Sequence, residues 1–334
     1  MAAFVRLINA RLNPPADPTG VSFEGKTVLV TGATSGLGFE AALKFLNLGV
    51  STLIIGSRSV ERGNRAKDEL ERRTNRAGVV QVWHLDMNTF GSVIEFAERI
   101  KREIPRLDVA LLNAGLSHRA FTPSPEGFEE TLQVNTLSTA LLALLLLPKL
   151  RESSSTSGPA HLTIVSSQQF TRVKAESLRT EGGLIQHLND PQRFSGGKQY
   201  AISKLLVEYA AKSIADLTRN DNGTLQVVVN SVSPGLCATA LGRQYNRPHE
   251  RLVVWILFKI FARTAEQGSR SLVSATFQGA ESHGRCWRHD GYVDESRTLT
   301  AGQEGRQFRE KAWREMVDIL KSKAPEVENI VGDQ

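Results

Sequence analysis

Thr31-Gly32-Ala33-Thr34-Ser35-Gly36-Leu37-Gly38 joins a short β-branched run, Lys26 to Thr31, to a segment with the apolar spacing of a helix. Gly32 permits a tight turn, Gly36 lets the backbone approach a phosphate, and Gly38 lets the helix pack closely on the strand. The amino end of the helix then offers unpaired N–H groups to a pyrophosphate. The stretch therefore predicts a strand–turn–helix unit that binds a dinucleotide.

Strands and helices alternate beyond this unit. Apolar or β-branched runs predict further strands at residues 52–55, 79–85, 108–112, 162–165 and 225–232. Helical patterns predict helices at residues 36–48, 60–73, 93–103, 136–150 and 200–217. Apolar strands that alternate with helices indicate a parallel sheet covered on both faces. We therefore predict an α/β fold, a doubly wound parallel sheet of the Rossmann type with three layers.

The length of 334 residues, 40% of them hydrophobic, suits one large α/β domain or two small ones. A linker rich in helix and strand breakers, Asn13 to Gly20, precedes the alternating pattern. We predict an N-terminal arm and linker at residues 1–24 and a single domain at residues 25–300. A substrate lid is expected around residues 240–263, and a C-terminal helix and tail at residues 301–334.

Composition argues against several classes of protein. The net charge is +6, but basic and acidic residues are interleaved, as in Lys101-Arg102-Glu103, so no nucleic-acid partner is predicted. Two cysteines, Cys237 and Cys286, exclude a disulfide framework and fit a reducing compartment. We predict a cytoplasmic location and no metal site.

Three apolar segments are too short to span a bilayer. Residues 1–12 are interrupted by arginines, and packing on the chain's own domain is favoured over contact with a membrane or a partner. Leu141 to Leu147 ends at Pro148, which indicates a buried helix that could supply a subunit interface. Residues 252–262 either close an apolar substrate pocket or lie on a membrane surface beside neighbouring cations, Arg247, Arg251 and Lys259.

The end of the second predicted strand should carry the residue that reads the adenosine ribose. A carboxylate there would accept hydrogen bonds from the ribose hydroxyls and would repel a 2′-phosphate. The chain has Gly56-Ser57-Arg58-Ser59 instead, and Arg58 can pair with a phosphate through its fork of donors. The residues therefore favour NADPH over NADH. The alternative is that Arg58 only starts a surface helix.

Tyr200 and Lys204 lie four residues apart in Tyr200-Ala201-Ile202-Ser203-Lys204, within a predicted helix, and so share one helical face. A nearby ammonium favours the phenolate and lowers the phenol pKa, which is about 10 when unperturbed. A phenol tuned in this way can act as a general acid or base. A half-buried tyrosine beside a solvated lysine is the alternative.

Together, the glycine turn and the Tyr200/Lys204 pair resemble the short-chain dehydrogenase/reductase family, in its single-domain branch, from about Lys26 to Val293. Other motifs of that family follow at the ends of later predicted strands. They are Leu85-Asp86-Met87, Asn113-Ala114-Gly115, Ser166-Ser167 and Pro234-Gly235-Leu236-Cys237-Ala238-Thr239, and Asn135 begins the long apolar helix.

The resemblance implies a catalytic set of Asn135, Ser167, Tyr200 and Lys204. Tyr200 would donate a proton to a carbonyl oxygen that Ser167 orients, Lys204 would bind the nicotinamide ribose and lower the Tyr200 pKa, and Asn135 would hold a water. From the residues alone, Asn135 can also be a helix N-cap, Asp86 can cap a helix, and the serines can merely end a strand.

The resemblance also implies NADP(H) as the cofactor. The residues expected to bind it are Thr31, Gly32, Thr34, Ser35, Gly36, Leu37, Gly38, Arg58, Asp86, Met87, Asn113, Ala114, Gly115, Tyr200, Lys204, Pro234, Gly235, Cys237 and Thr239.

Residues 168–199 form an insertion relative to compact members, and long loops of this kind tend to build binding sites. The insertion and Arg263-Thr264-Ala265-Glu266-Gln267-Gly268 resemble retinol-dehydrogenase-like and WW-domain-oxidoreductase-like members. The tail, with Cys286-Trp287 and Trp313, resembles fungal members of biosynthetic gene clusters.

The expected activity is an NADPH-dependent reductase of ketones or aldehydes, or the reverse alcohol dehydrogenase. Its substrate would be a bulky apolar small molecule of fungal secondary metabolism. One alternative is a retinol- or steroid-like dehydrogenase at a membrane surface. Another is a cofactor-binding scaffold or a non-redox cyclase or isomerase. A homodimer or homotetramer is expected from the family.

Overall fold

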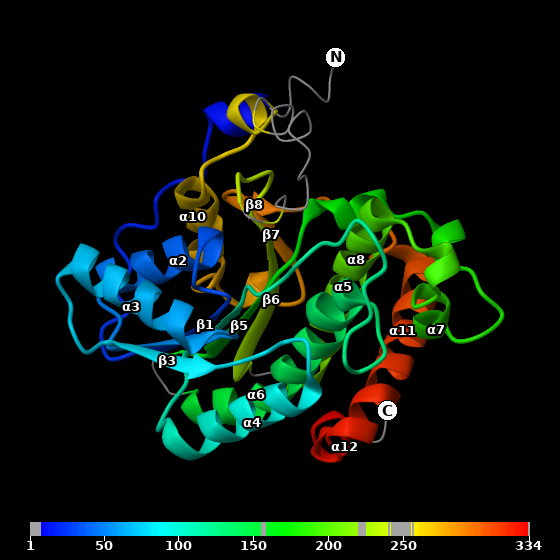
Figure 1. Ribbon diagram of the computed structural model, residues 1–334, viewed down its shortest axis with the longest axis horizontal. Coiled ribbons are helices and arrows are strands. Elements are labelled where there is room, and N and C mark those ends of the chain that lie inside the picture. Colours follow the sequence, from blue (N-terminus) through cyan, green and yellow to red (C-terminus); the bar gives the residue numbers. More distant parts are fainter. Residues whose placement is uncertain are drawn as a thin grey trace.

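The structure, a computed structural model, describes residues 8–154, 158–219, 225–239, 241, 255 and 257–332. Over these residues the strands form one sheet in the order β3-β2-β1-β4-β5-β6-β7-β8 (Figure 1). Every neighbouring pair is parallel except the last, β7 and β8. The strands are β1 (Thr27–Thr31), β2 (Thr52–Ser57), β3 (Val80–His84), β4 (Val109–Leu112), β5 (Ala160–Val165), β6 (Val227–Ser233), β7 (Cys286–Arg288) and β8 (Gly291–Tyr292).

Helices cover both faces of this sheet and make three layers (Figure 1). One face carries α2 (Gly36–Asn47), α3 (Val60–Thr74) and α10 (Ala265–Ala275). The other carries α4 (Phe90–Glu103), α6 (Ser138–Ser153) and α8 (Gly196–Leu217), with α11 (Gly302–Lys323) and α12 (Glu326–Val331) packed outside them. Two short helices, α5 (Glu130–Leu132) and α7 (Leu184–Leu188), complete this side. The predicted doubly wound α/β fold is confirmed.

Burial on both faces explains why the strands are apolar throughout. Along β1, Leu29 belongs to one hydrophobic cluster and Val28 and Val30 belong to the other. Alternate side chains of a strand point to opposite faces, so a strand covered on both sides needs no polar positions.

The sheet order reverses beside β1, because the chain runs outward to β3 and then returns to form β4 on the other side of β1. In open α/β sheets, ligands bind at such a switch point, outside the carboxyl ends of the strands. The glycine turn follows β1 and the Asn113 segment follows β4, so both motifs meet at this edge.

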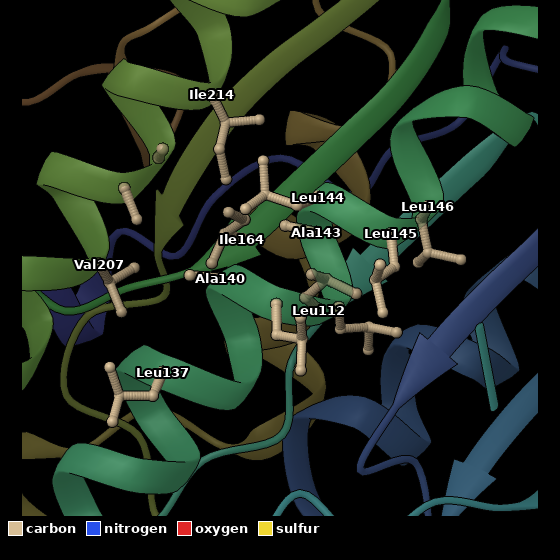
Figure 2. Packing of buried hydrophobic residues seen from close by; sticks show 14 of the residues in the cluster. Leu112, Leu137, Ala140, Ala143, Leu144, Leu145, Leu146, Ile164, Val207 and Ile214 are labelled. Carbon is tan, nitrogen blue, oxygen red and sulfur yellow. The ribbon is translucent and has the colours of Figure 1, made fainter. Parts of the chain in front are cut away.

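The leucines of α6 fill the core between the sheet and the neighbouring helices. Leu144 and Leu145 lie among Leu112, Ile164 and Ile214 in Figure 2, and Leu141 to Leu147 are fully buried within one chain. The expectation that this segment supplies a subunit interface is therefore wrong, because its side chains are already covered. The helical stretch Glu130–Ser153 is long and apolar enough to cross a bilayer, but 94% of its most apolar 18 residues are buried inside the protein.

Pro148 lies inside α6, which runs to Ser153, past the predicted end at residue 150, with Leu150 fully buried in the core. A proline removes one backbone donor and crowds the preceding turn, but the packing of the flanking turns retains the helix. The β7–β8 hairpin was not predicted, because two strands of three and two residues carry no readable alternation.

The N-terminal arm contains a short helix at residues 8–12, and a second short helix ends at residue 261. Most of the segment predicted as a lid, residues 240–263, lies outside the described residues. The described part of it is considered below with the cofactor loop.

Candidate active site

The glycine turn has the geometry that its sequence predicts. Gly32 and Gly36 have φ values of +68° and +59°, in the left-handed region that favours glycine. A Cβ atom on Gly38 would lie 2.5 Å from the Gly32 carbonyl oxygen and 2.5 Å from Asn113 Nδ2. No other residue type can therefore bring α2 this close to the turn and to the segment after β4.

Asn113 fastens the glycine turn from the neighbouring strand. Its Nδ2 donates hydrogen bonds to the carbonyl oxygens of Thr31 at 2.9 Å and Gly32 at 3.3 Å. In return, Thr31 Oγ1 accepts the backbone N–H groups of Asn113 and Ala114, both at 2.9 Å. The residues predicted to touch the adenosine thus also fix the shape of the turn.

The amino end of α2 is left open to a ligand. Its N-cap residue, Ser35, makes no side-chain capping bond, and the first turn contains no acidic residue, within the part of the chain that the structure describes. Thr239, from the loop after β6, lies 3.7 Å from the position of a Cβ on Gly36. Free N–H groups and the positive end of the helix dipole suit a phosphate here.

The predicted ribose and adenine positions lie at the neighbouring strand ends. Arg58 is exposed and follows β2 directly, while the Gly56 carbonyl accepts the Gly32 N–H at 3.1 Å. Asp86 follows β3, and its Oδ1 accepts the Asn88 N–H at 3.0 Å. Because Thr89 is the N-cap of α4, Asp86 does not cap that helix, and Met87 beside it is buried.

Tyr200 and Lys204 project from α8 toward the same edge of the sheet. Lys204 is only 4% exposed, and its Nζ donates to the Val165 carbonyl at 2.8 Å and lies 5.9 Å from the centre of the Tyr200 ring. A Cβ on Gly115 would lie 3.6 Å from this Nζ and 3.2 Å from Asn135 Oδ1. The absence of a side chain at Gly115 leaves room between the strand end and the lysine.

Asn135 lies inside a π-helical turn, Gln133–Leu137, that joins α5 to α6. It is 1% exposed; its Oδ1 accepts the Leu116 N–H at 2.9 Å, and its Nδ2 donates to the Leu116 carbonyl at 2.8 Å and to Ser203 Oγ at 3.0 Å. The prediction that Asn135 begins the long helix, or caps it, is wrong, because the helix already starts at Glu130 behind a cap from Glu129. Turns of this type often occur at functional sites.

Ser167 lies two residues beyond the end of β5 and is the N-cap of a 3₁₀ turn, Gln168–Arg172. A hydrogen bond with its side chain lowers the pKa of Tyr200, but burial raises that pKa more strongly, so the net shift is upward. The expectation that Lys204 lowers the phenol pKa is thus not met in this structure. Burial also lowers the pKa of Lys204 to about 8, against the opposing charge of Glu208.

Sequence reasoning missed Glu208, which lies one helical turn beyond Lys204 and is fully buried. Its Oε2 accepts a hydrogen bond from Ser231 Oγ at 2.7 Å, and burial raises its pKa. The four-residue spacing from Tyr200 to Lys204 to Glu208 is visible in the sequence and could have revealed it.

The loop Pro234–Thr239, which we name the cofactor loop, is held from outside by Arg263. The Arg263 N–H donates to the Leu236 carbonyl and the Ala238 N–H donates to the Arg263 carbonyl, both at 2.9 Å. Gly235 has a φ of +80°. A Cβ on Gly268 would lie 2.4 Å from Cys237 Sγ, so α10 packs directly against the loop.

The insertion at residues 168–199 packs beside the loop that follows β4. The rings of Phe121 and Phe194 meet edge to face at 5.8 Å between centroids. At its far side, α11 supports the insertion, because Glu315 accepts the N–H groups of Leu184 and Ile185, both at 2.8 Å. Within the described ranges, no three His, Cys, Asp or Glu side chains gather to hold a metal ion.

The structure therefore gathers Asn135, Ser167, Tyr200 and Lys204 at the strand ends beside the glycine turn. A phenol that retains its proton, a hydroxyl bonded to it and a buried ammonium can together protonate an oxygen atom. The open amino end of α2 provides a phosphate site at the same edge of the sheet.

This chain is similar to known proteins over most of its length. A family model described as short chain dehydrogenase matches residues 26–172. The short-chain dehydrogenase/reductase phmF of Phaeosphaeria nodorum is 44% identical, over 96% of this chain and 94% of its own length. The short-chain dehydrogenase/reductase ffsI of Aspergillus flavipes is 41% identical, over 97% of this chain and 94% of its own length.

Solved structures share the fold. The Pseudomonas aeruginosa RhlG/NADP active-site complex has a TM-score of 0.60 at 22% identity, covering 81% of this chain and 96% of that one. An uncharacterised protein from Mycobacterium paratuberculosis has a TM-score of 0.64 at 22% identity, covering 92% of this chain and 98% of that one.

Proposed function

The chain belongs to the short-chain dehydrogenase/reductase family, and on that premise we propose an NADPH-dependent oxidoreductase that interconverts ketones or aldehydes and alcohols. The proposed substrate is a bulky, largely apolar small molecule of fungal secondary metabolism, since the relatives at 41–44% identity are fungal and associated with such metabolism. The observation that carries the proposal is the grouping of Tyr200, Ser167 and Lys204 beside the open end of α2.

In the proposed reduction, NADPH supplies a hydride to the carbonyl carbon. Tyr200 donates its phenol proton to the carbonyl oxygen, and Ser167 orients that oxygen by a hydrogen bond. The raised pKa of Tyr200 keeps this proton in place near neutral pH, which suits the reducing direction. Lys204 binds the nicotinamide ribose, and Asn135 is proposed to hold a water that returns a proton from solvent.

NADPH is preferred to NADH in this proposal because no carboxylate follows β2. Arg58 is exposed at the position where a 2′-phosphate would need a cation. The solved RhlG structure with this fold is a complex with NADP, which is consistent with the proposal. Two buried, unpaired cysteines suit the cytoplasm as the proposed location.

A fluorescence titration with NADPH and NADH tests the cofactor. We expect NADPH to bind about tenfold or more tightly, a difference of about 1.4 kcal/mol, and Arg58→Glu to abolish the preference. Equal binding of both cofactors by the unaltered protein would contradict the role of Arg58.

Tyr200→Phe tests the redox reaction. We expect its reduction rate to fall by about two orders of magnitude or more, because general acid catalysis contributes that much. Tyr292→Phe, which removes a phenol on β8, is the matched control and should leave the rate unchanged. A rate retained in Tyr200→Phe would instead favour a scaffold or a non-redox enzyme.

A retinol- or steroid-like dehydrogenase at a membrane surface is the second candidate. It is favoured by large apolar side chains that are exposed near the N-terminal arm, among them Leu12, Trp255, Leu257 and Ile260. Pelleting with liposomes, with and without residues 1–12, distinguishes the two. Binding that only the full chain shows would support the membrane enzyme.

A further inference from the structure

Arg263 joins the N-terminal arm to the body of the molecule. It is only 2% exposed, its Nε donates to the Ala10 carbonyl at 2.6 Å, and its Nη2 donates to the Asn13 carbonyl at 3.2 Å. The same Nη2 contacts His289 Nε2. A buried guanidinium thus has two of its acceptors on a segment about 250 residues away in the sequence.

The same residue also supports the cofactor loop. Its backbone exchanges two hydrogen bonds with Leu236 and Ala238, both at 2.9 Å. Among the residues that the structure describes, its Nη1 is buried without a hydrogen-bond partner, and it lies 3.6 Å from the position of a Cβ on Gly235. One arginine therefore contacts the arm through its side chain and the loop through its backbone.

Further bonds fix the arm along residues 8–18. Arg270 Nη1 donates to the Pro15 carbonyl at 3.2 Å, and the Ala16 N–H donates to Asp290 Oδ2 at 3.1 Å. Lys44 forms ion pairs with Asp17 at 2.8 Å and with Glu266 at 2.7 Å. In Figure 1 the short blue helix of the arm lies beside the yellow helix that precedes Arg263, and the Arg11 guanidinium donates to the Lys259 carbonyl.

Losing the arm contacts would remove the two carbonyl acceptors of the buried Arg263 guanidinium, at Ala10 and Asn13, and leave it the contact with His289. A buried charge that has lost its acceptors destabilises the protein by more than the lost hydrogen bonds had contributed. This penalty is relieved only if water reaches the guanidinium or if the segment that carries Arg263 moves. Because the Arg263 backbone is bonded to Leu236 and Ala238, a movement of Arg263 displaces the cofactor loop with it.

We propose that Arg263 is a positioning residue through which the N-terminal arm holds the cofactor loop in the conformation that binds the nicotinamide. The last clause rests on the proposed function, whereas the coupling between arm and loop does not. Coupling between two sites is reciprocal, so cofactor binding should also stabilise the arm.

Hydrogen exchange of the full chain without cofactor tests the coupling directly. In Arg263→Lys, which keeps the charge but loses the fork of donors, we expect amides of residues 8–13 and 235–239 to exchange at least tenfold faster. Arg270→Lys is the matched control, because it weakens the arm at Pro15 without contacting the loop, and loop exchange should stay unchanged. Unchanged loop exchange in Arg263→Lys would overturn the proposal.

NADPH supplies the second measurement. We expect it to slow exchange of residues 8–13 in the unaltered protein but not in Arg263→Lys, whose NADPH affinity should fall about tenfold. Equal protection of the arm in both proteins would overturn the proposal. If Arg263→Lys does not fold, the unaltered protein alone decides. Slower exchange of the arm when NADPH is bound would then support the proposal, and unchanged exchange would overturn it. Failure of NADPH to bind the unaltered protein would refute the proposed function, while the exchange without cofactor would still decide the coupling.

Discussion

Burial controls the ionisation of Tyr200 and Lys204. It raises the pKa of the phenol and lowers that of the ammonium to about 8, so both groups tend toward their neutral forms. Sequence spacing correctly predicts that the two side chains share a helical face. It could not predict the direction of the phenol shift, because the burial that raises this pKa depends on tertiary packing and not on spacing along α8.

The lowered pKa of Lys204 predicts a rise of stability with pH. The unfolded chain keeps this lysine protonated up to about pH 10.5, whereas the folded chain releases the proton near pH 8. Stability therefore rises between these values, because the unfolded state binds more protons there, and the burial cost is fully present below pH 8. Between about pH 8 and pH 10.5, the free energy of unfolding of the unaltered protein should rise by up to about 3 kcal/mol relative to that of Lys204→Met.

Urea unfolding of the two proteins from pH 7.5 to 10.5 measures this gain. Taking the difference between them removes the contributions of titrating groups that do not interact with Lys204. A difference that does not change with pH would show that Lys204 is hydrated in the folded state.

At the scale of elements, α7 depends on a carboxylate from a distant helix. Five residues rarely make a stable helix alone, and the amino end of α7 is bonded to Glu315 of α11 instead of to a local cap. The insertion that contains α7 is thus folded by the C-terminal region.

Glu315→Ala should destabilise the insertion by about 1 kcal/mol, the usual contribution of a capping group. We expect faster proteolysis within residues 173–195, with little change in the exchange of the central strands. Glu310→Ala, an exposed glutamate on the same helix, is the control. Equal proteolysis of both variants would mean that Glu315 does not support α7.

The sequence could predict those helices and strands whose ends are marked by local residue patterns. The ends of β1, α2 and α3 lie within one residue of the predicted bounds, since glycines, serines and β-branched runs mark them. The π-helical turn at Asn135 and the β7–β8 pair could not be predicted, because neighbouring helices and strands determine them.

At the scale of the whole molecule, the C-terminal helices belong to the main core. Trp313, Met316 and Leu320 of α11 and Val327 of α12 are buried in the cluster that contains the α6 leucines. The sequence predicted a terminal helix but could not place it, because its position depends on contacts with α6 and α8.

Truncation after Ala301 should therefore abolish cooperative unfolding of the protein. Removal of α11 and α12 exposes a large apolar surface at roughly 25 cal/mol per Å², more than the margin of a typical domain. Dye binding and a broad thermal transition would confirm the loss. A sharp transition in the truncated protein would show that the sheet folds without these helices.

The reactivity of the two cysteines can be used to measure how often the fold opens locally and globally. Both thiols are buried, and burial raises the pKa of Cys237 to about 12 and that of Cys286 well above its usual value, so neither reacts while covered. Cys237 lies in the cofactor loop, and Cys286 begins β7, where it pairs with Ser231 of β6 and is fully buried in the core. A fast alkylating reagent would therefore label Cys237 at the rate at which the loop opens and Cys286 at the rate of global unfolding, and peptide mass spectra over one time course would measure both rates.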